Sequence, residues 1–135
     1  MKRRSLFMAL AGLGVASLLP TDRALSAWPR VRRTLIQTSP LAGFQYHQGE
    51  RLWPYFRTGD ALSLVREPAN PYDPQAVRID WQGHKLGYVP RRENTAISQM
   101  LDRGERLSAA IERLSTGPSP WTRIRFSAWL EAWER

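Results

Sequence analysis

The sequence predicts a small, mainly β domain with one or two short helices, folded as a small barrel or a strongly curved sheet. The first observation is that apolar and polar residues alternate in several short segments, which is the pattern of half-buried strands. The second is that only one stretch, between Asn94 and Gly104, has the apolar spacing of a helix. The third is the length of 135 residues, which allows one domain of ordinary size.

The expected strands follow one another at short intervals. The first is interrupted at Ser39-Pro40, which suits an edge strand or a bend. Gln82-Gly83 is a two-residue turn that would join two strands into a hairpin. A loop is expected over residues 116–120, where glycine and two prolines cluster. The strands are expected at residues 35–46, 61–66, 76–81, 84–89, 107–111 and 122–130.

The helix is expected to begin after Asn94 as its N-cap and to stop at Gly104. Between them Ile97, Met100 and Leu101 are spaced at i, i+3 and i+4, which places them on one apolar face. The sequence therefore predicts a short helix that packs against the sheet.

Residues 1–26 have the three parts of a secretory signal peptide. A basic start at residues 2–4 precedes an apolar stretch at residues 6–19, and Ala24-Leu25-Ser26 offers small residues before a cleavage at Ala27. The apolar stretch is shorter than the ~20 residues of a membrane-spanning helix. An uncleaved inner-membrane anchor through residues 6–19 is the alternative. The expected location is the periplasm or the outside of the cell.

The segment Arg3-Arg4-Ser5-Leu6-Phe7 resembles a twin-arginine export signal. An ordinary secretory signal often carries paired basic residues too, so the export route stays open.

Composition excludes several classes of function. The chain has no cysteine, which rules out disulfides, thiolate metal sites and cysteine nucleophiles. Its two histidines, His47 and His84, are too few for a histidine-rich metal cluster. No phosphate-binding glycine loop and no catalytic arrangement is recognisable, so we predict a protein that is not an enzyme and needs neither cofactor nor metal. The net charge is +8, and +5 if residues 1–26 are removed with their four basic residues and one acidic residue.

The segment from Arg66 to Val77 is rich in turn-forming residues. Three prolines restrict the loop, and Asn70 and Asp73 can close turns with their side chains. In one interpretation, such a loop displays Tyr72 and Asp73 for recognition of a ligand. In the other, Tyr72 packs over the domain as a lid and Asp73 caps the turn.

The segment from Leu86 to Asn94 leaves a strand through a proline and presents Arg91 and Arg92 before a helix start. Guanidinium groups beside free backbone N–H groups favour an anion such as phosphate. A solvated charged turn, with Glu93 neutralising one arginine, is the other interpretation.

Taken together, these segments resemble the HIRAN domain over about Ser39 to Leu114. The resemblance rests on several spaced motifs and on the helix that follows them. The motifs are Ala42-Gly43-Phe44-Gln45-Tyr46, Gly59-Asp60-Ala61-Leu62, Arg66-Glu67-Pro68, Asn70-Pro71-Tyr72-Asp73, Ala76-Val77 and Lys85-Leu86-Gly87-Tyr88-Val89-Pro90-Arg91.

The resemblance implies a small OB-like β-barrel that binds single-stranded DNA and recognises its free 3′ end. It implies base stacking on Tyr46, which lies on the first strand in this family, and on His47 in place of a second aromatic residue. It also implies that Tyr72 and Asp73 hold the terminal nucleotide, and that Tyr88 and Arg91 contact the backbone. Gln45 replaces a basic residue of the family pattern. The helicase-like motor found beside this domain in other proteins is absent from the 135 residues.

The expected organisation is a signal peptide at 1–26, a basic leader at 27–33, a HIRAN-like domain at 34–115 and a C-terminal strand extension at 116–135. An export signal and a DNA-binding domain conflict, because single-stranded DNA ends are not routinely handled outside the cytoplasm. The alternative is therefore a periplasmic binding module for an envelope protein or another ligand. Trp121, Trp129 and Trp133 would then form an interaction surface or simply pack on the barrel.

Overall fold

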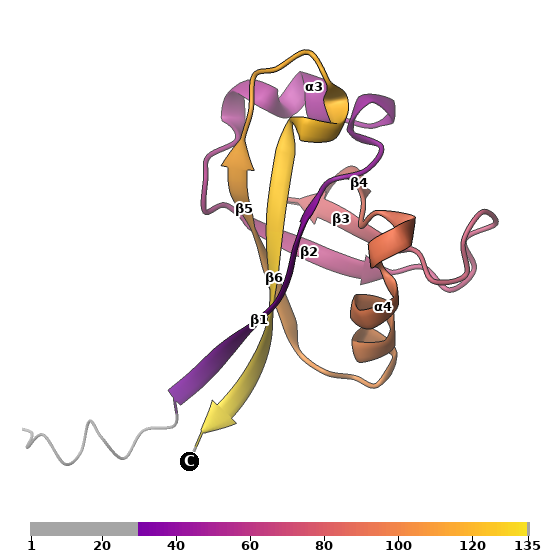
Figure 1. The fold of residues 1–135 in the computed structure, drawn as a ribbon, viewed down its shortest axis with the longest axis vertical. Helices are drawn as coiled ribbons and strands as arrows, with labels where there is room; N and C mark the ends of the chain where they lie inside the picture. The colour runs from indigo at the N-terminus through magenta and orange to yellow at the C-terminus, as the bar shows by residue number, and fades with distance from the viewer. Residues whose placement is uncertain (1–29, 135) are drawn as a thin grey trace, which may run out of the picture. The chain divides into compact units, whose positions relative to one another are not determined.

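The computed structural model describes residues 30–134. This part of the chain contains six strands in one antiparallel sheet (Figure 1). The strand order is β1-β6-β5-β2-β3-β4. The strands are β1 (Arg30–Pro40), β2 (Ala61–Arg66), β3 (Val77–Trp81), β4 (His84–Tyr88), β5 (Leu107–Leu114) and β6 (Ile124–Glu134). The α-helices are α3 (Gly49–Leu52) and α4 (Thr95–Asp102), and the short 3-10 helices are η1 (Phe44–Tyr46), η2 (Trp53–Tyr55), η3 (Arg91–Glu93) and η4 (Pro120–Thr122).

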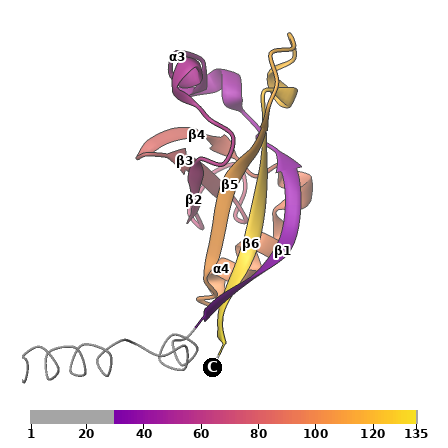
Figure 2. The same cartoon turned by 90° about the vertical axis from the view of Figure 1, so that its left-hand side faces the viewer.

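The sheet is strongly curved because β2 belongs to both of its halves. Ala61 and Leu62 pair with β5, whereas residues 63–66 pair with β3. In both views the long strands β5 and β6 run together, and β2, β3 and β4 cross them (Figures 1 and 2). The expectation of a mainly β domain with a strongly curved sheet and short helices is confirmed.

The sheet does not close into a barrel, which corrects the barrel that the family resemblance implied. Its edge strands are β1 and β4, and the chain just after β1 meets β4 at an isolated bridge between Ala42 and Tyr88, whose backbone groups exchange two hydrogen bonds of 2.9 Å. Pro40 ends β1 because it lacks a backbone N–H group. Only Leu41 and Ala42 then remain before the chain turns at Gly43 with φ of 77°.

Gly87 permits this close approach of the two edges. A Cβ atom at this position would stand 2.2 Å from the carbonyl oxygen of Ala42. Only a residue without a side chain therefore fits opposite the bridge.

The expected first strand at residues 35–46 was wrong at both ends. The strand β1 begins at Arg30, within the expected basic leader, and ends at Pro40. Residues 44–46 form η1 instead, because Phe44 is buried in the core and the left-handed Gly43 turns the chain inwards. Tyr46 therefore lies on a 3-10 helix and not on the first strand.

The other elements follow the sequence pattern closely. The strand β2 has the expected bounds, and the hairpin turn has positive φ angles at both Gln82 and Gly83, as a two-residue turn of this kind requires. The helix α4 ends at Asp102 and is followed by the left-handed Gly104, and the N–H of Glu105 bonds to the carbonyl of Met100. The strand β6 starts at Ile124 and runs past the expected end to Glu134.

One hydrophobic core lies on the inner face of the curved sheet, within the compact unit of residues 31–133. The core contains residues from strands β2 to β6, from α4 and from the segment 41–56 that follows β1. Its least exposed members include Phe44, Val77, Ile79, Leu86, Ile97, Ile111, Ile124 and Phe126.

The predictions for residues 1–26 lie outside the described residues. In the described part, no helix is long and apolar enough to cross a membrane.

Candidate functional site

The six residues selected from the sequence line one groove, whose volume is about 1110 Å³. The groove lies between η1, the loop that joins β2 to β3, the strand β4 and the start of η3. The six are Tyr46, His47, Tyr72, Asp73, Tyr88 and Arg91.

Two tyrosine rings in the groove are exposed to solvent. Tyr46 is 77% exposed and Tyr72 is 85% exposed. Among residues 30–134, neither ring contacts another aromatic ring. The two side chains therefore present flat apolar faces on which another flat group can stack.

Tyr88 and His47 are more enclosed. The two rings meet edge to face, with centroids 5.9 Å apart, and the Nζ atom of Lys85 lies 4.8 Å from the Tyr88 ring centroid. Burial, together with the nearby Lys85 ammonium, lowers the pKa of His47 below its ordinary value. The lowered pKa favours the neutral imidazole at pH 7, which offers mainly an aromatic surface.

The loop of residues 67–76 is fixed by its own side chains. The Asn70 carbonyl oxygen accepts hydrogen bonds from the N–H groups of Tyr72 (2.9 Å) and Asp73 (3.1 Å). Asp73 accepts one bond from the N–H of Gln75 (2.9 Å) and one from the Asn94 amide (2.7 Å). This arrangement holds Tyr72 outwards and fixes the direction of the Asp73 carboxylate.

Asn94 lies immediately before α4, as expected, but its side chain does not cap the helix. Its amide donates to Asp73 instead, which ties the loop to the helix. One buried asparagine therefore fixes the position of the loop relative to the start of the helix.

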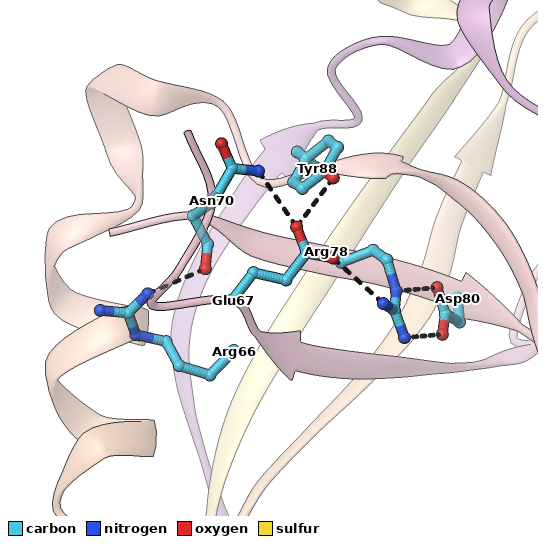
Figure 3. A network of polar contacts seen from close by, with 7 residues as sticks. Arg66, Glu67, Asn70, Arg78, Asp80 and Tyr88 are labelled. Atoms are coloured by element: carbon cyan, nitrogen blue, oxygen red, sulfur yellow. Dashed lines mark hydrogen bonds and ion pairs between the residues drawn. The ribbon is translucent and has the colours of Figure 1, made fainter. Parts of the chain in front are cut away.

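Glu67 is the centre of the polar network that supports the groove (Figure 3). One carboxylate oxygen accepts bonds from the Tyr88 hydroxyl (2.8 Å) and the Asn70 amide (3.1 Å). The other accepts from Arg78 at 3.0 Å, and Arg78 makes two further bonds to Asp80 at 2.9 and 3.0 Å. A single carboxylate thus positions both the groove wall at Tyr88 and the loop at Asn70.

The hydrogen bonds that Glu67 accepts decide its ionisation. Burial raises the pKa of Glu67, but the hydrogen bonds from Asn70, Tyr88 and Arg78 outweigh it, and the net pKa is below the ordinary value of 4.5. The charged carboxylate is therefore the form that the folded domain favours.

We expect the stability that Glu67 contributes to be present above about pH 4.5 and to be lost as pH falls through the lower pKa of the folded state. The substitution Glu67→Gln should cost about 1–3 kcal/mol at pH 7, because an amide has only one acceptor oxygen and cannot accept both from Arg78 on one side and from Tyr88 and Asn70 on the other. Urea unfolding of both proteins between pH 7 and pH 3 measures this. The two stabilities should converge at low pH, and a constant difference would contradict the assignment.

Charges in the groove nearly balance. Arg91 and Lys85 supply positive charge, and Glu67 and Asp73 supply negative charge. Arg91 is exposed, and no ion pair or hydrogen bond engages its guanidinium within the described chain. It is therefore available to an external anion, whereas Glu67 is held by its partners.

Four further residues belong to the site and are not indicated by the sequence: Glu67, Arg78, Asp80 and Asn94. The sequence pattern places Asn94 at a helix cap and Glu67 in a turn-rich motif. The alternation of β3 puts Arg78 and Asp80 on one face, but nothing in the sequence indicates that Glu67 reaches Arg78. Among residues 30–134, no group of three or more histidine, aspartate or glutamate side chains could hold a metal ion.

The structure is thus a small β domain with a strongly curved sheet and a groove that exposes aromatic rings. The chain belongs to the HIRAN domain family, whose model matches residues 36–133. The match confirms the resemblance found in the sequence, and it extends through β6 into the segment expected to be a C-terminal extension.

Known proteins similar to this chain include a bacterial protein, a human domain and a plant nuclease. A Lactobacillus plantarum protein of known crystal structure has a TM-score of 0.66 and 25% identity, and the match covers 76% of this chain and 98% of that one. The crystal structure of the HIRAN domain of human HLTF has a TM-score of 0.59 at 16% identity, covering 74% and 79%, which shows a shared fold. The Fanconi-associated nuclease 1 homolog of Oryza sativa subsp. japonica is 27% identical over 74 residues. The match covers 52% of this chain and only 7% of that nuclease.

Proposed function

We propose that the domain binds single-stranded nucleic acid in the groove, with single-stranded DNA bearing a free 3′ end as the preferred ligand. The observation that carries the proposal is the convergence of Tyr46, Tyr72 and Arg91 on one groove. Membership of the HIRAN family, whose domains are nucleic-acid-binding modules, supports it. The domain would act as a binding module with no catalytic group of its own.

Stacking is the main source of affinity in this proposal. Bases stack on exposed aromatic faces in proteins that bind single strands, with about 1–3 kcal/mol per base. Tyr46 and Tyr72 have such faces, and His47 and Tyr88 provide a neutral aromatic wall beside them. The near balance of charge in the groove implies few phosphate contacts, of which Arg91 makes one.

Asp73 would distinguish the end of a strand from its interior. Its carboxylate is fixed by Gln75 and Asn94, and each oxygen has a further lone pair that can accept a bond from a terminal 3′ hydroxyl. A 3′ phosphate would be repelled by the same carboxylate. Tyr88 would line the groove without donating a hydrogen bond to the nucleic-acid backbone, because its hydroxyl hydrogen already bonds to Glu67.

The proposed end recognition predicts that the domain binds a 3′-hydroxyl oligonucleotide more tightly than its 3′-phosphate counterpart. Asp73→Asn should reduce this preference, because it removes the charge that repels the phosphate. The fold should persist, because the Asn94 amide can turn over and accept a hydrogen bond from the introduced amide. Its carbonyl oxygen is free to do so, since it is buried without a partner in the unmutated domain. Fluorescence anisotropy with matched oligonucleotides measures both affinities.

Equal binding of the two oligonucleotides by the unmutated domain would remove the end-recognition proposal. Binding of neither at low salt would remove the nucleic-acid proposal as a whole.

We also propose that residues 1–26 direct export and that the mature protein starts near Ala27; the pattern of basic, apolar and small residues supports this. N-terminal sequencing of protein from its native host should return Ala27, and Met1 would contradict cleavage. Changing Arg3 and Arg4 to lysine should abolish export by the twin-arginine route and leave an ordinary secretory route intact.

A further inference from the structure

The strands β1 and β6 continue beyond the rest of the sheet as a two-stranded ribbon (Figures 1 and 2). The last residue of β6 that pairs with β5 is Leu130, which lies opposite Leu107, the first residue of β5. One further bond joins the N–H of Glu131 to the carbonyl of Arg106 at 2.9 Å. We call residues 31–35 of β1 and 131–133 of β6 the ribbon tip.

The ribbon tip exposes apolar side chains that no part of the described domain covers. Seven large hydrophobic residues are exposed among residues 30–134, and three of them are Val31 (44%), Leu35 (57%) and Trp133 (58%) of the tip. The other four are aromatic, so the exposed aliphatic residues of this set occur at the tip alone. Every residue from 31 to 35 is exposed, which means that both faces of this strand meet solvent. Such a cluster is typical of a contact surface.

Positive charge surrounds these apolar residues. Arg32 and Arg33 belong to the tip, and Arg106 is exposed beside it, with no ion pair or hydrogen bond engaging its guanidinium within residues 30–134. The acidic residue of the tip is Glu131, whose carboxylate lies 3.2 Å from the Nε atom of Arg33. In the sequence, the segment 27–33 contains three arginines and no acidic residue. The surface around the tip is therefore basic.

The combination of aliphatic residues, a tryptophan and arginines is typical of a surface that enters the interface of a membrane. Tryptophan favours the level of the lipid headgroups, and arginine extends its guanidinium to lipid phosphates while its stem stays among apolar groups. Two other occupants fit this chemistry less well. A single strand of nucleic acid needs flat rings for stacking, which Val31 and Leu35 do not offer. A second copy of the tip would bring the same positive charge.

The sequence before β1 points to the same surface. The apolar stretch at residues 6–19 ends twelve residues before Val31, and twelve residues span at most about 43 Å. A membrane that holds residues 6–19, during export or as a lasting anchor, would therefore lie within reach of the ribbon tip.

We propose that the ribbon tip docks on an anionic phospholipid surface. Val31, Leu35 and Trp133 enter the interface, and Arg33 and Arg106 contact lipid phosphates. The proposal does not depend on the nucleic-acid groove, because no residue of the tip lines that groove.

The test measures how brominated acyl chains of lipid quench the fluorescence of Trp133. The full chain is mixed with vesicles of brominated phosphatidylcholine, either alone or together with brominated phosphatidylglycerol. Tryptophan fluorescence should be quenched more strongly in the anionic vesicles, and Trp133→Phe should remove this difference. The matched control Trp121→Phe should keep it, because Trp121 is similarly exposed (54%) but lies in η4, before the start of β6.

Charge and apolar contact are tested by separate variants. Arg33→Gln combined with Arg106→Gln should lower the ratio of docked to undocked protein about 25-fold, or about 5-fold for each arginine, which corresponds to about 1 kcal/mol each. Leu35→Ser should lower the same ratio. The matched control Arg92→Gln combined with Arg113→Gln removes two exposed charges outside the tip and should lower the ratio far less. Since all of these side chains are exposed, the urea midpoint should stay the same.

Three results would overturn the proposal. The first is equal quenching in neutral and anionic vesicles, and the second is a difference between them that survives Trp133→Phe. The third is a dimer in the absence of lipid that shields Trp133 from a soluble quencher, since a second copy would then cover the tip. Loss of DNA binding bears on the groove alone, so the failure of either proposal can be told from the failure of the other.

Discussion

Replacing Tyr46 and Tyr72 together with alanine is expected to weaken binding of single-stranded DNA by about 2–6 kcal/mol, since each stacked base contributes about 1–3 kcal/mol. Both rings are more than three-quarters exposed, so their removal leaves no cavity and the domain should remain as stable as before. Fluorescence anisotropy measures the affinity, and urea unfolding checks the stability of the variant.

The chain offers a matched control for this loss. Tyr55 is 65% exposed but does not line the groove, so Tyr55→Ala should bind as the unmutated domain does. An equal loss in Tyr55→Ala would show that the effect is not specific to the groove. Full affinity of the double variant would contradict stacking on Tyr46 and Tyr72.

The salt dependence separates stacking from phosphate contacts. The logarithm of affinity for single strands falls with the logarithm of salt concentration by about 0.7 per neutralised phosphate. The tyrosine variants should therefore keep the slope of the unmutated domain, whereas Arg91→Gln should reduce it by about one contact. Because opposite charges nearly balance in the groove, the slope itself should be small.

Strand positions were predictable wherever one face of a strand meets the core. In β3, Val77 and Ile79 are buried and Arg78 is not, as the alternation in the sequence predicts, although Asp80 on the face of Arg78 is buried too. The limits of β1 were not predictable in this way, because its first residues are exposed on both faces and carry no alternation of burial. The change from strand to 3-10 helix after Pro40 depends on the burial of Phe44, whose ring meets Trp53 and the far more distant Arg123.

The sequence predicts which exposed residues line the groove, but it does not predict the residues that hold them in place. Tyr72 and Asp73 stand in a proline-rich loop, and Arg91 follows a proline, so local sequence suggested that they are displayed. The role of Glu67 depends on contacts with Arg78 and Tyr88, which lie 11 and 21 residues away in the chain. Such contacts follow from strand pairing and cannot be inferred from spacing alone.

This division has a physical consequence for the site. The exposed aromatic groups should tolerate substitution without loss of the fold, whereas the groups that place them are buried, as Phe44 and Asn94 are, or partly buried, as Glu67 is. Tyr46 is held in place by η1, and η1 is anchored by Phe44. A substitution at Phe44 should therefore affect the fold first and binding only through it.

Phe44→Ala is expected to reduce the free energy of unfolding by about 3–5 kcal/mol, the usual cost of removing a buried phenylalanine. The Phe44 side chain has no exposed surface and meets Trp53 edge to face, with ring centroids 5.9 Å apart. The guanidinium of Arg123 lies 5.2 Å from the same ring. A Cβ atom at Gly49 would stand 2.2 Å from the ring, so the backbone of α3 packs directly against it.

The expected loss is a large share of the 5–15 kcal/mol that stabilises a typical domain, so the urea midpoint should fall strongly. Phe44→Leu should lose less, because leucine fills part of the same space. Tyr46→Ala, two residues further along, should leave the midpoint unchanged while it weakens binding. An unchanged midpoint in Phe44→Ala would contradict the burial of this ring, and weakened binding by a fully folded Phe44→Ala domain would show that Phe44 positions Tyr46 directly.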